Sequence, residues 1–168
     1  MHVGNEQWVA DIQKRYSDEI TGAKLLELGS LNINGTARDL MKPATWIGID
    51  QTAGPCVDIV CRAAETAFTE AEFDVILSTS MIEHDPDWRE SLAHNLFWLK
   101  PGGLFLLSWG AEGNHRHDPE PWAAVPVGDV LQWCLNMKLE ILEACWEKHR
   151  YEGDCMGCYD MVLRKRPA

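Results

Sequence analysis

The chain has little positive charge and no long apolar run. It carries 15 Lys and Arg against 26 Asp and Glu, a formal net charge of −11 at pH 7. This balance argues against a nucleic-acid-binding protein, because the electrostatic attraction that dominates binding to phosphates would be repulsive. The acidity also fits a simple role in solubility. No apolar stretch is long enough to span a bilayer and nothing resembles a signal peptide, so we expect a cytoplasmic protein that binds neither nucleic acid nor membrane.

Internal repeats, low-complexity segments and Pro- or Ser-rich linkers are also absent. A chain of 168 residues with 46% hydrophobic residues can bury a sizeable core. We therefore expect residues 1–168 to form a single domain.

Six cysteines are present, but a cytosolic setting favours free thiols over disulfides. Cys155 and Cys158 form one C-x-x-C, without a second pair at the spacing of a zinc site. A metal or redox role and a place in a hairpin turn both stay open, and we favour the turn. No metal site is assigned.

The stretch around Glu27 organises the rest of the chain. Ala23–Leu28 is interpreted as a buried strand of a parallel sheet. A turn rich in Gly, Ser and Asn follows it, and a helix is expected to begin at Thr36. In open α/β sheets, ligands bind where a strand ends and its loop leads into a helix. A carboxylate at this point can reach a cationic group.

The same alternation of strand, turn and helix continues along the chain. Further strands are expected at 45–49, 57–60, 73–79, 104–109, 139–146 and 159–163. Helices are expected at 5–20, 36–42, 88–99 and 127–138. This order predicts an α/β fold: a seven-stranded, mostly parallel sheet with helices on both faces and a C-terminal antiparallel hairpin. The N-terminal helix, within residues 1–21, is expected to cover the core.

Asp50 ends the second expected strand, about 20 residues beyond the glycine turn. In dinucleotide-binding folds an acid at this place accepts from both hydroxyls of a ribose. An Asp at a strand end can equally cap a turn. Both interpretations remain open.

Short blocks of the chain, in order, resemble the class I S-adenosylmethionine-dependent methyltransferases, of the type called methyltransferase domain 11. The blocks are Leu25–Gly29, Gly48–Asp50, Asp58–Val60, Phe73–Ser78, Met81–His84 and Leu99–Gly103. The resemblance implies a Rossmann-like fold. It also implies transfer of a methyl group from S-adenosylmethionine to an unidentified small-molecule acceptor, leaving S-adenosylhomocysteine.

The resemblance further implies roles for matching positions. Glu27 and the first loop would face the methionine part, Asp50 the ribose, Arg62 and Ala63 the adenine, and Ser78 the methionine amino group. The expected cofactor-binding residues are Glu27, Gly29, Ser30, Asn32, Asp50, Gln51, Arg62, Ala63, Ala64, Ser78 and Thr79.

The first loop departs from the family's G-x-G-x-G, since only its first glycine is kept. Leu31 and Ile33 carry side chains that restrict backbone approach. The loop must therefore curve differently, with Asn32, Asn34 and Gly35 supplying any positive-φ positions.

A second departure is Arg62, which stands where the family commonly has an acid that accepts from the adenine amino group. An Arg cannot accept a hydrogen bond. The backbone of Ala63 would then carry adenine recognition, with Arg62 free to stack.

Three histidines are candidate catalytic bases. Methyl transfer from a sulfonium needs positioning and, for a hydroxyl acceptor, removal of one proton. His84 can serve as this base or simply shape its loop. His115 and His117 lie in a polar segment, residues 110–125, that we expect to be the acceptor loop. Together with Asp118 and Glu112 they could also form a metal site, since an H-x-H on a strand puts both rings on one face. A loop does not align the rings in this way, so we favour a solvated substrate loop.

Two other functions remain in view. Asp50 also suits the nicotinamide cofactor of an NAD-dependent oxidoreductase, but a G-x-G-x-x-G and a Tyr-x-x-x-Lys pair are missing. A non-catalytic S-adenosylmethionine-binding or interaction domain would explain the altered first loop. The sequence leaves the acceptor and the oligomeric state open.

Overall fold

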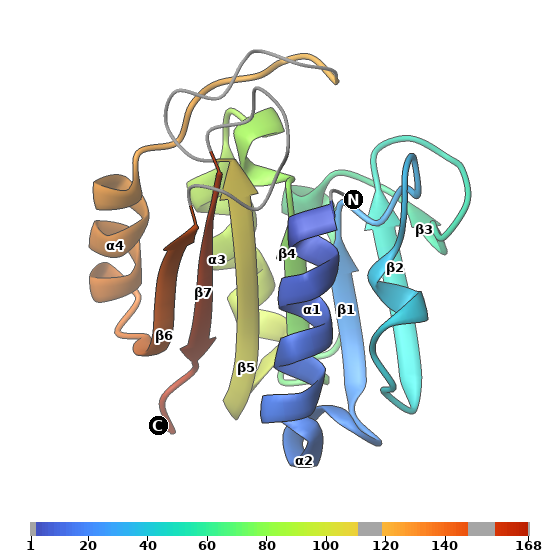
Figure 1. The fold of residues 1–168 in the computed structure, drawn as a ribbon, viewed down its shortest axis with the longest axis vertical. Helices are drawn as coiled ribbons and strands as arrows, with labels where there is room; N and C mark the ends of the chain where they lie inside the picture. Colours follow the sequence, from blue (N-terminus) through green and yellow to red (C-terminus); the bar gives the residue numbers. More distant parts are fainter. Residues whose placement is uncertain (1–2, 111–118, 148–156, 168) are drawn as a thin grey trace.

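The computed structural model describes residues 3–110, 119–147 and 157–167. These residues form one seven-stranded sheet in the order β3-β2-β1-β4-β5-β7-β6 (Figure 1). The strands are β1 (Lys24–Leu28), β2 (Thr45–Asp50), β3 (Ile59–Val60), β4 (Phe73–Thr79), β5 (Leu99–Gly110), β6 (Glu140–Glu147) and β7 (Cys158–Arg164). β1 to β5 pair in parallel, whereas β7 is antiparallel to both β5 and β6. The predicted fold class, including the C-terminal antiparallel hairpin, is confirmed.

Helices cover both faces of the sheet. The described helices are α1 (Val3–Arg15), α2 (Ser17–Ile20), α3 (Trp88–Trp98) and α4 (Val127–Asn136). Successive residues of a strand point to opposite faces, so Leu25 packs with α1 and α2, and Leu26 packs with α3 and α4. The sheet therefore separates two apolar layers.

The N-terminal helix ends earlier than expected. The predicted helix over 5–20 is divided at Tyr16, which leaves helical geometry (φ −114°, ψ 34°) between α1 and α2. The Tyr16 hydroxyl donates to Glu143 Oε1 (2.7 Å), and Arg15 also binds Glu143 (2.8 Å). These contacts hold the break against β6. Trp8, on α1, is buried in the core as expected.

The predicted helix over 36–42 is wrong. Its place is taken by a single 3₁₀ turn, η1 (Ala37–Asp39), where the Thr36 hydroxyl accepts from the Arg38 N–H (3.2 Å). Pro43 disfavours helical geometry in the residue before it, which leaves too few residues to nucleate an α-helix. Two more 3₁₀ turns, η2 (Ala63–Glu65) and η3 (Ile82–His84), follow β3 and β4.

Two further boundaries differ from the prediction. β5 begins at Leu99, earlier than the predicted strand over 104–109. α4 ends at Asn136, whereas the predicted helix continues to 138, and Leu135 near its end is 64% exposed. A helix turns about 100° per residue, so Leu135 points away from the face on which Trp133 and Cys134 are buried.

Candidate active site

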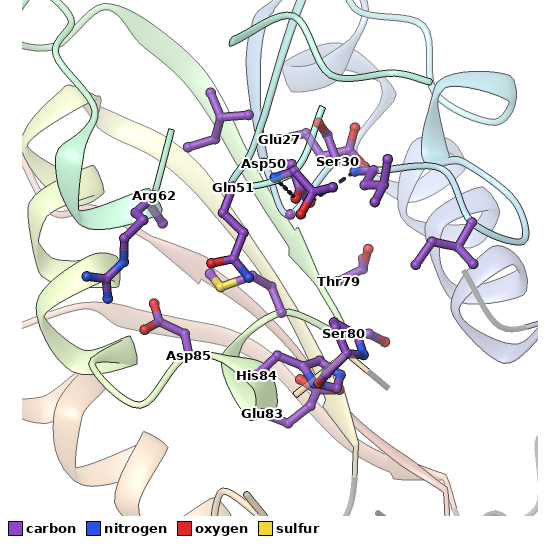
Figure 2. A pocket seen from close by; sticks show the side chains of 18 of the residues that line it. Glu27, Ser30, Asp50, Gln51, Arg62, Thr79, Ser80, Glu83, His84 and Asp85 are labelled. Atoms are coloured by element: carbon purple, nitrogen blue, oxygen red, sulfur yellow. Dashed lines mark hydrogen bonds between the residues drawn. The ribbon is translucent and has the colours of Figure 1, made fainter. Parts of the chain in front are cut away.

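A cavity of about 880 Å³ opens at the carboxyl ends of β1, β2 and β4 (Figure 2). Its walls are the loops that follow these strands, together with the start of η2, the end of β5 and residues of the predicted acceptor loop. Ligands of open α/β sheets gather at this edge, and the volume lies within the range of small-molecule sites. The predicted site residues that line it are Glu27, Gly29, Ser30, Asp50, Gln51, Arg62, Ala63, Thr79 and His84.

The loop after β1 begins at Gly29, where only glycine fits. Its φ of +74° is left-handed, and a Cβ there would lie 2.9 Å from the Cβ and Cγ of Met81. The N–H groups of Gly29 and Ser30 both donate to Ile49 O (3.0 Å each). Any contact of these two residues with a ligand must therefore use other atoms.

The side chain of Leu31 packs against the loop after β2. The Leu31 N–H donates to Asp50 Oδ2 (3.2 Å) and the Asn32 N–H donates to Pro55 O (3.0 Å). A Cβ on Gly54 would lie 2.3 Å from Leu31 Cδ1, so this glycine makes room for the leucine. The two loops thus brace each other.

Positive φ within this loop occurs at Gly29 and Gly35 (φ +129°), and the prediction that Asn32 and Asn34 also supply it is wrong. Asn32 Oδ1 accepts from the Gly35 N–H (2.9 Å). The Asn32 side chain forms a hydrogen bond within its own loop and does not line the cavity.

Asp50 both caps its turn and faces the cavity. Its Oδ1 accepts from the Thr52 N–H (2.8 Å), and its Oδ2 accepts from Leu31. Each carboxylate oxygen has a second lone pair. The carboxylate can therefore hold the two loops and still accept from two hydroxyls of a ligand.

Glu27 is a nearly buried acid in the cavity wall, with 4% of its surface exposed. The Trp46 indole N–H donates to its Oε2 (3.0 Å). Burial raises the pKa of the Glu27 carboxyl from its ordinary 4.5 to about 7, although the Trp46 bond and the charge of Arg38 act in the opposite direction. An ionised Glu27 is thus poorly solvated, and a cationic ligand would stabilise it.

Arg38 lies behind this acid and fastens the loop after β2. Its guanidinium donates to Cys56 O (2.8 Å), pairs with Asp58, and lies 5.7 Å from the centre of the Trp46 ring. Asp58 in turn accepts from the Gly48 N–H (2.7 Å).

Arg62 lies on the opposite side of the cavity from Ser80 (Figure 2), and the next residue, Ala63, also lines the cavity. The Arg62 guanidinium pairs with Asp87 (3.2 Å), and both side chains are about half exposed. Ala64, predicted as a cofactor residue, does not line the cavity. Successive residues of a 3₁₀ turn point about 120° apart, so Ala63 and Ala64 face different directions.

Ser78 is also outside the cavity lining, unlike its neighbour Thr79. It is completely buried, since Leu28 on β1 and Leu107 on β5 are its register partners on either side. Its predicted contact with the methionine amino group is not supported by this placement.

His84 ends η3 at the other side of the cavity. Its Nδ1 lies 2.6 Å from Pro119 O. Because a carbonyl oxygen only accepts, Nδ1 carries the proton, and a neutral ring then has its lone pair on Nε2. The adjacent Glu83 is buried and its Oε1 accepts from the Gly110 N–H (3.2 Å).

The other two predicted bases, His115 and His117, lie outside the described residues, as does Cys155. Of the predicted acceptor loop, Pro119 and Pro121 line the cavity. The Ala123 N–H donates to Glu83 O (2.7 Å), which ties the described end of this loop to η3.

Sequence reasoning missed Ser80 and Met81, which line the cavity, and Trp46, which holds Glu27. The pairing of strands gives a signal by which the role of Trp46 could have been found. Glu27 is in register with Gly48, so a residue two positions earlier on β2 is its diagonal neighbour on the same face. No comparable signal identifies Ser80.

Comparison with known proteins gives a family match. The sequence profile of the methyltransferase domain family matches residues 21–107, slightly more than half of the chain. The chain is 38% identical over 86 residues to a ubiquinone biosynthesis O-methyltransferase of Paramagnetospirillum magneticum. That match covers 50% of this chain and 32% of the relative, so the chain spans about a third of the relative's length.

Solved structures share the fold. A 1,6-didemethyltoxoflavin-N1-methyltransferase of Burkholderia thailandensis, solved with S-adenosylhomocysteine, superposes with a TM-score of 0.73 at 17% identity, covering 96% of this chain and 78% of the other. The [4+2]-cyclase SpnF superposes with a TM-score of 0.75 at 15% identity, covering 97% and 81%. At such identities the likeness describes the fold alone, and one of these two proteins is titled a cyclase.

Proposed function

This chain belongs to the methyltransferase domain family, and on that premise we propose that it transfers a methyl group from S-adenosylmethionine to a small-molecule acceptor, leaving S-adenosylhomocysteine. One observation carries the proposal. Two acids near the carboxyl ends of β1 and β2, Glu27 and Asp50, face a single cavity large enough for a cofactor and an acceptor together.

The residues of the cavity fit this cofactor. Asp50 has oxygens that can accept from both ribose hydroxyls. Glu27 would be stabilised as an anion by the positive charge of the sulfonium or the amino group. Arg62 and Ala63 would lie along the adenine, with Arg62 held at the rim by Asp87.

The sulfonium of the bound cofactor supplies an activated methyl carbon. The protein then has to hold the acceptor in line and take up its proton. We assign the second task to His84, whose Nδ1 proton is committed to Pro119 O and whose ring lines the cavity. His115 and His117 stay candidates for the same task.

An oxygen acceptor is favoured by two observations. A base such as His84 is needed for a hydroxyl group but not for an uncharged amine. The 38% identical relative is named as an O-methyltransferase. We therefore propose a small hydroxyl compound, acting in the cytoplasm; the net charge of −11 supports the further proposal that nucleic acid is not the substrate.

No helix among the described residues has the length and apolar character needed to cross a membrane. Within residues 3–110, 119–147 and 157–167, no three His, Cys, Asp or Glu side chains are grouped as a metal site.

Calorimetric titration with S-adenosylmethionine, S-adenosylhomocysteine and NAD tests the proposal first. We expect the first two to bind and NAD not to bind. Incubation with methyl-labelled S-adenosylmethionine and separate sets of phenols, aliphatic alcohols and amines then tests transfer. Binding without transfer to any set would favour the non-catalytic alternative, and binding of NAD alone would favour an oxidoreductase.

A further inference from the structure

A buried polar network joins the N-terminal helix to the wall of the cavity. Asn5, in the first turn of α1, is completely buried, and its Nδ2 donates to Ser80 Oγ (2.9 Å). The Ser108 hydroxyl on β5 lies within hydrogen-bond distance of Asp160 Oδ1 on β7 (2.7 Å) and, at a longer distance, of Asn5 Oδ1 (3.3 Å). The Asn5 amide is thus held between the loop after β4 and Ser108 on β5, and Ser108 in turn contacts Asp160 on β7.

Ser80 is held in an unfavourable backbone conformation. Its φ is +51°, in the left-handed region that residues with a Cβ rarely adopt. The Ser80 N–H donates to Ser108 O (2.9 Å), and the Asn5 amide holds its side chain. Such conformations persist only when the surroundings impose them, and they occur often at ligand-binding sites.

The direction of the hydrogen bond from Asn5 leaves the hydroxyl proton of Ser80 for a ligand. Its oxygen accepts from Asn5, so its own proton needs an acceptor elsewhere. Among the described residues no acceptor receives this proton, and Ser80 lines the cavity (Figure 2). The hydroxyl is therefore a donor presented to whatever fills the cavity.

The part of the cavity near Ser80 is where the amino-acid end of the cofactor would lie. Asp50 and Arg62 would take the ribose and adenine, and Figure 2 shows Ser80 on the side away from Arg62. Of the polar groups at that end, the ammonium only donates and the carboxylate only accepts. A fixed donor is matched by the carboxylate.

We propose that Ser80 binds the carboxylate of the cofactor's amino-acid end, and that Asn5 is a positioning residue that orients the Ser80 hydroxyl. The inference rests on the proposed function, since it requires S-adenosylmethionine in this cavity. It adds two residues, from α1 and from the loop after β4, to the expected cofactor site.

The test compares two probes by calorimetry: S-adenosylhomocysteine and 5′-methylthioadenosine, which lacks the amino-acid end. Loss of a hydrogen bond to a charged group should weaken S-adenosylhomocysteine binding by about tenfold or more in Ser80→Ala and Ser80→Gly. Binding of methylthioadenosine should change by less than about twofold. A purely structural role would weaken both probes together.

Asn5 is tested through a double-mutant cycle. Asn5→Ala should weaken S-adenosylhomocysteine binding in the wild-type background but add nothing in Ser80→Ala, because the amide acts through the hydroxyl. Equal losses in both backgrounds would overturn the positioning role.

Two glycine variants serve as controls for effects on folding. Ser80→Gly and Ser80→Ala both remove the acceptor for Asn5 Nδ2, but only glycine relieves the left-handed backbone, so Ser80→Gly should unfold at a higher temperature than Ser80→Ala. Lys138→Gly is a matched control, because Lys138 has a similar φ of +55° just after α4 and does not line the cavity. It should keep wild-type affinity for both probes.

The outcomes separate the two proposals. If the wild-type protein binds neither probe, the proposed function fails. If it binds both and Ser80→Ala binds S-adenosylhomocysteine as tightly as wild type, the function stands and the role of Ser80 is refuted.

Discussion

Glu27 shows how one residue can be placed for a ligand at a cost to the unliganded fold. An acid whose folded pKa of about 7 exceeds its ordinary 4.5 binds its proton more tightly in the folded state. Between these two pH values the folded state holds more protons than the unfolded state, so the free energy of unfolding decreases as pH rises, and it is level above about 7.

The first prediction follows from this decrease in the free energy of unfolding with rising pH. Glu27→Gln keeps an acceptor for the Trp46 indole but cannot ionise, so it should be more stable than wild type at pH 8, by up to about 3 kcal/mol. At pH 4 the two proteins should differ little. Urea unfolding at pH 4, 6 and 8 measures the difference. A constant difference at all three pH values would show that Glu27 has an ordinary pKa.

A second prediction concerns Asp50. Its replacement by Ala removes two expected bonds to the ribose, each worth about 1.5–3 kcal/mol because the acceptor is charged. Affinity for S-adenosylhomocysteine should fall at least about tenfold by calorimetry. Asp129→Ala, which breaks an exposed pair with Arg89 outside the cavity lining, is the control. Unchanged affinity in Asp50→Ala would place the cofactor elsewhere.

At the scale of elements, the loop after β1 is shaped by packing more than by glycine content. Loops that follow different strands are in contact through side chains: Leu31 packs against Gly54, and Met81 packs against Gly29. The connection between β1 and β2 contains only a 3₁₀ turn in place of a helix. The strand ends therefore carry loops that support each other directly.

A third prediction separates strain from contact at Gly29. Gly29→Ala should lower the free energy of unfolding by more than Gly22→Ala, which has a similar φ of +84° but nothing within 4 Å of its added Cβ. Gly22→Ala reports the backbone cost alone, about 1–2 kcal/mol. The excess in Gly29→Ala measures displacement of Met81. Equal losses in urea unfolding would mean that Met81 moves aside freely.

At the scale of the whole molecule, one sheet divides two apolar layers. Leu25 and Leu26 are both completely buried, but in different layers. If residues 1–168 form a single domain, as the sequence predicts, both layers should be lost in one transition because they share every central strand.

A fourth prediction tests this cooperativity. Leu25→Ala and Leu26→Ala should each cost about 2–5 kcal/mol, with coincident transitions by circular dichroism and tryptophan fluorescence. Ile33→Ala, at a side chain that is 72% exposed, should change stability by less than about 0.5 kcal/mol. Two separate transitions in either leucine variant would contradict a single cooperative unit.

The sequence by itself determined the fold class, the family and the edge of the sheet where the site lies. Glu27 and Asp50 could be placed because each lies at the carboxyl-terminal part of its own strand, and parallel strands bring their carboxyl ends to one edge. Alternating strands and helices are read from local periodicity, which needs no knowledge of distant residues. Hence the seven-stranded, mostly parallel sheet with its terminal hairpin was predicted correctly.

Only the tertiary structure decided which side chains reach the cavity. Thr79 lines it whereas Ser78 is covered by β1 and β5, a difference that depends on the neighbouring strands. Asn5 and Ser80 are 75 residues apart, and their hydrogen bond exists because α1 packs along one face of the sheet with its first turn near the carboxyl ends of the strands (Figure 1). Such contacts follow from how elements pack, and periodicity and strand ends contain no information about them.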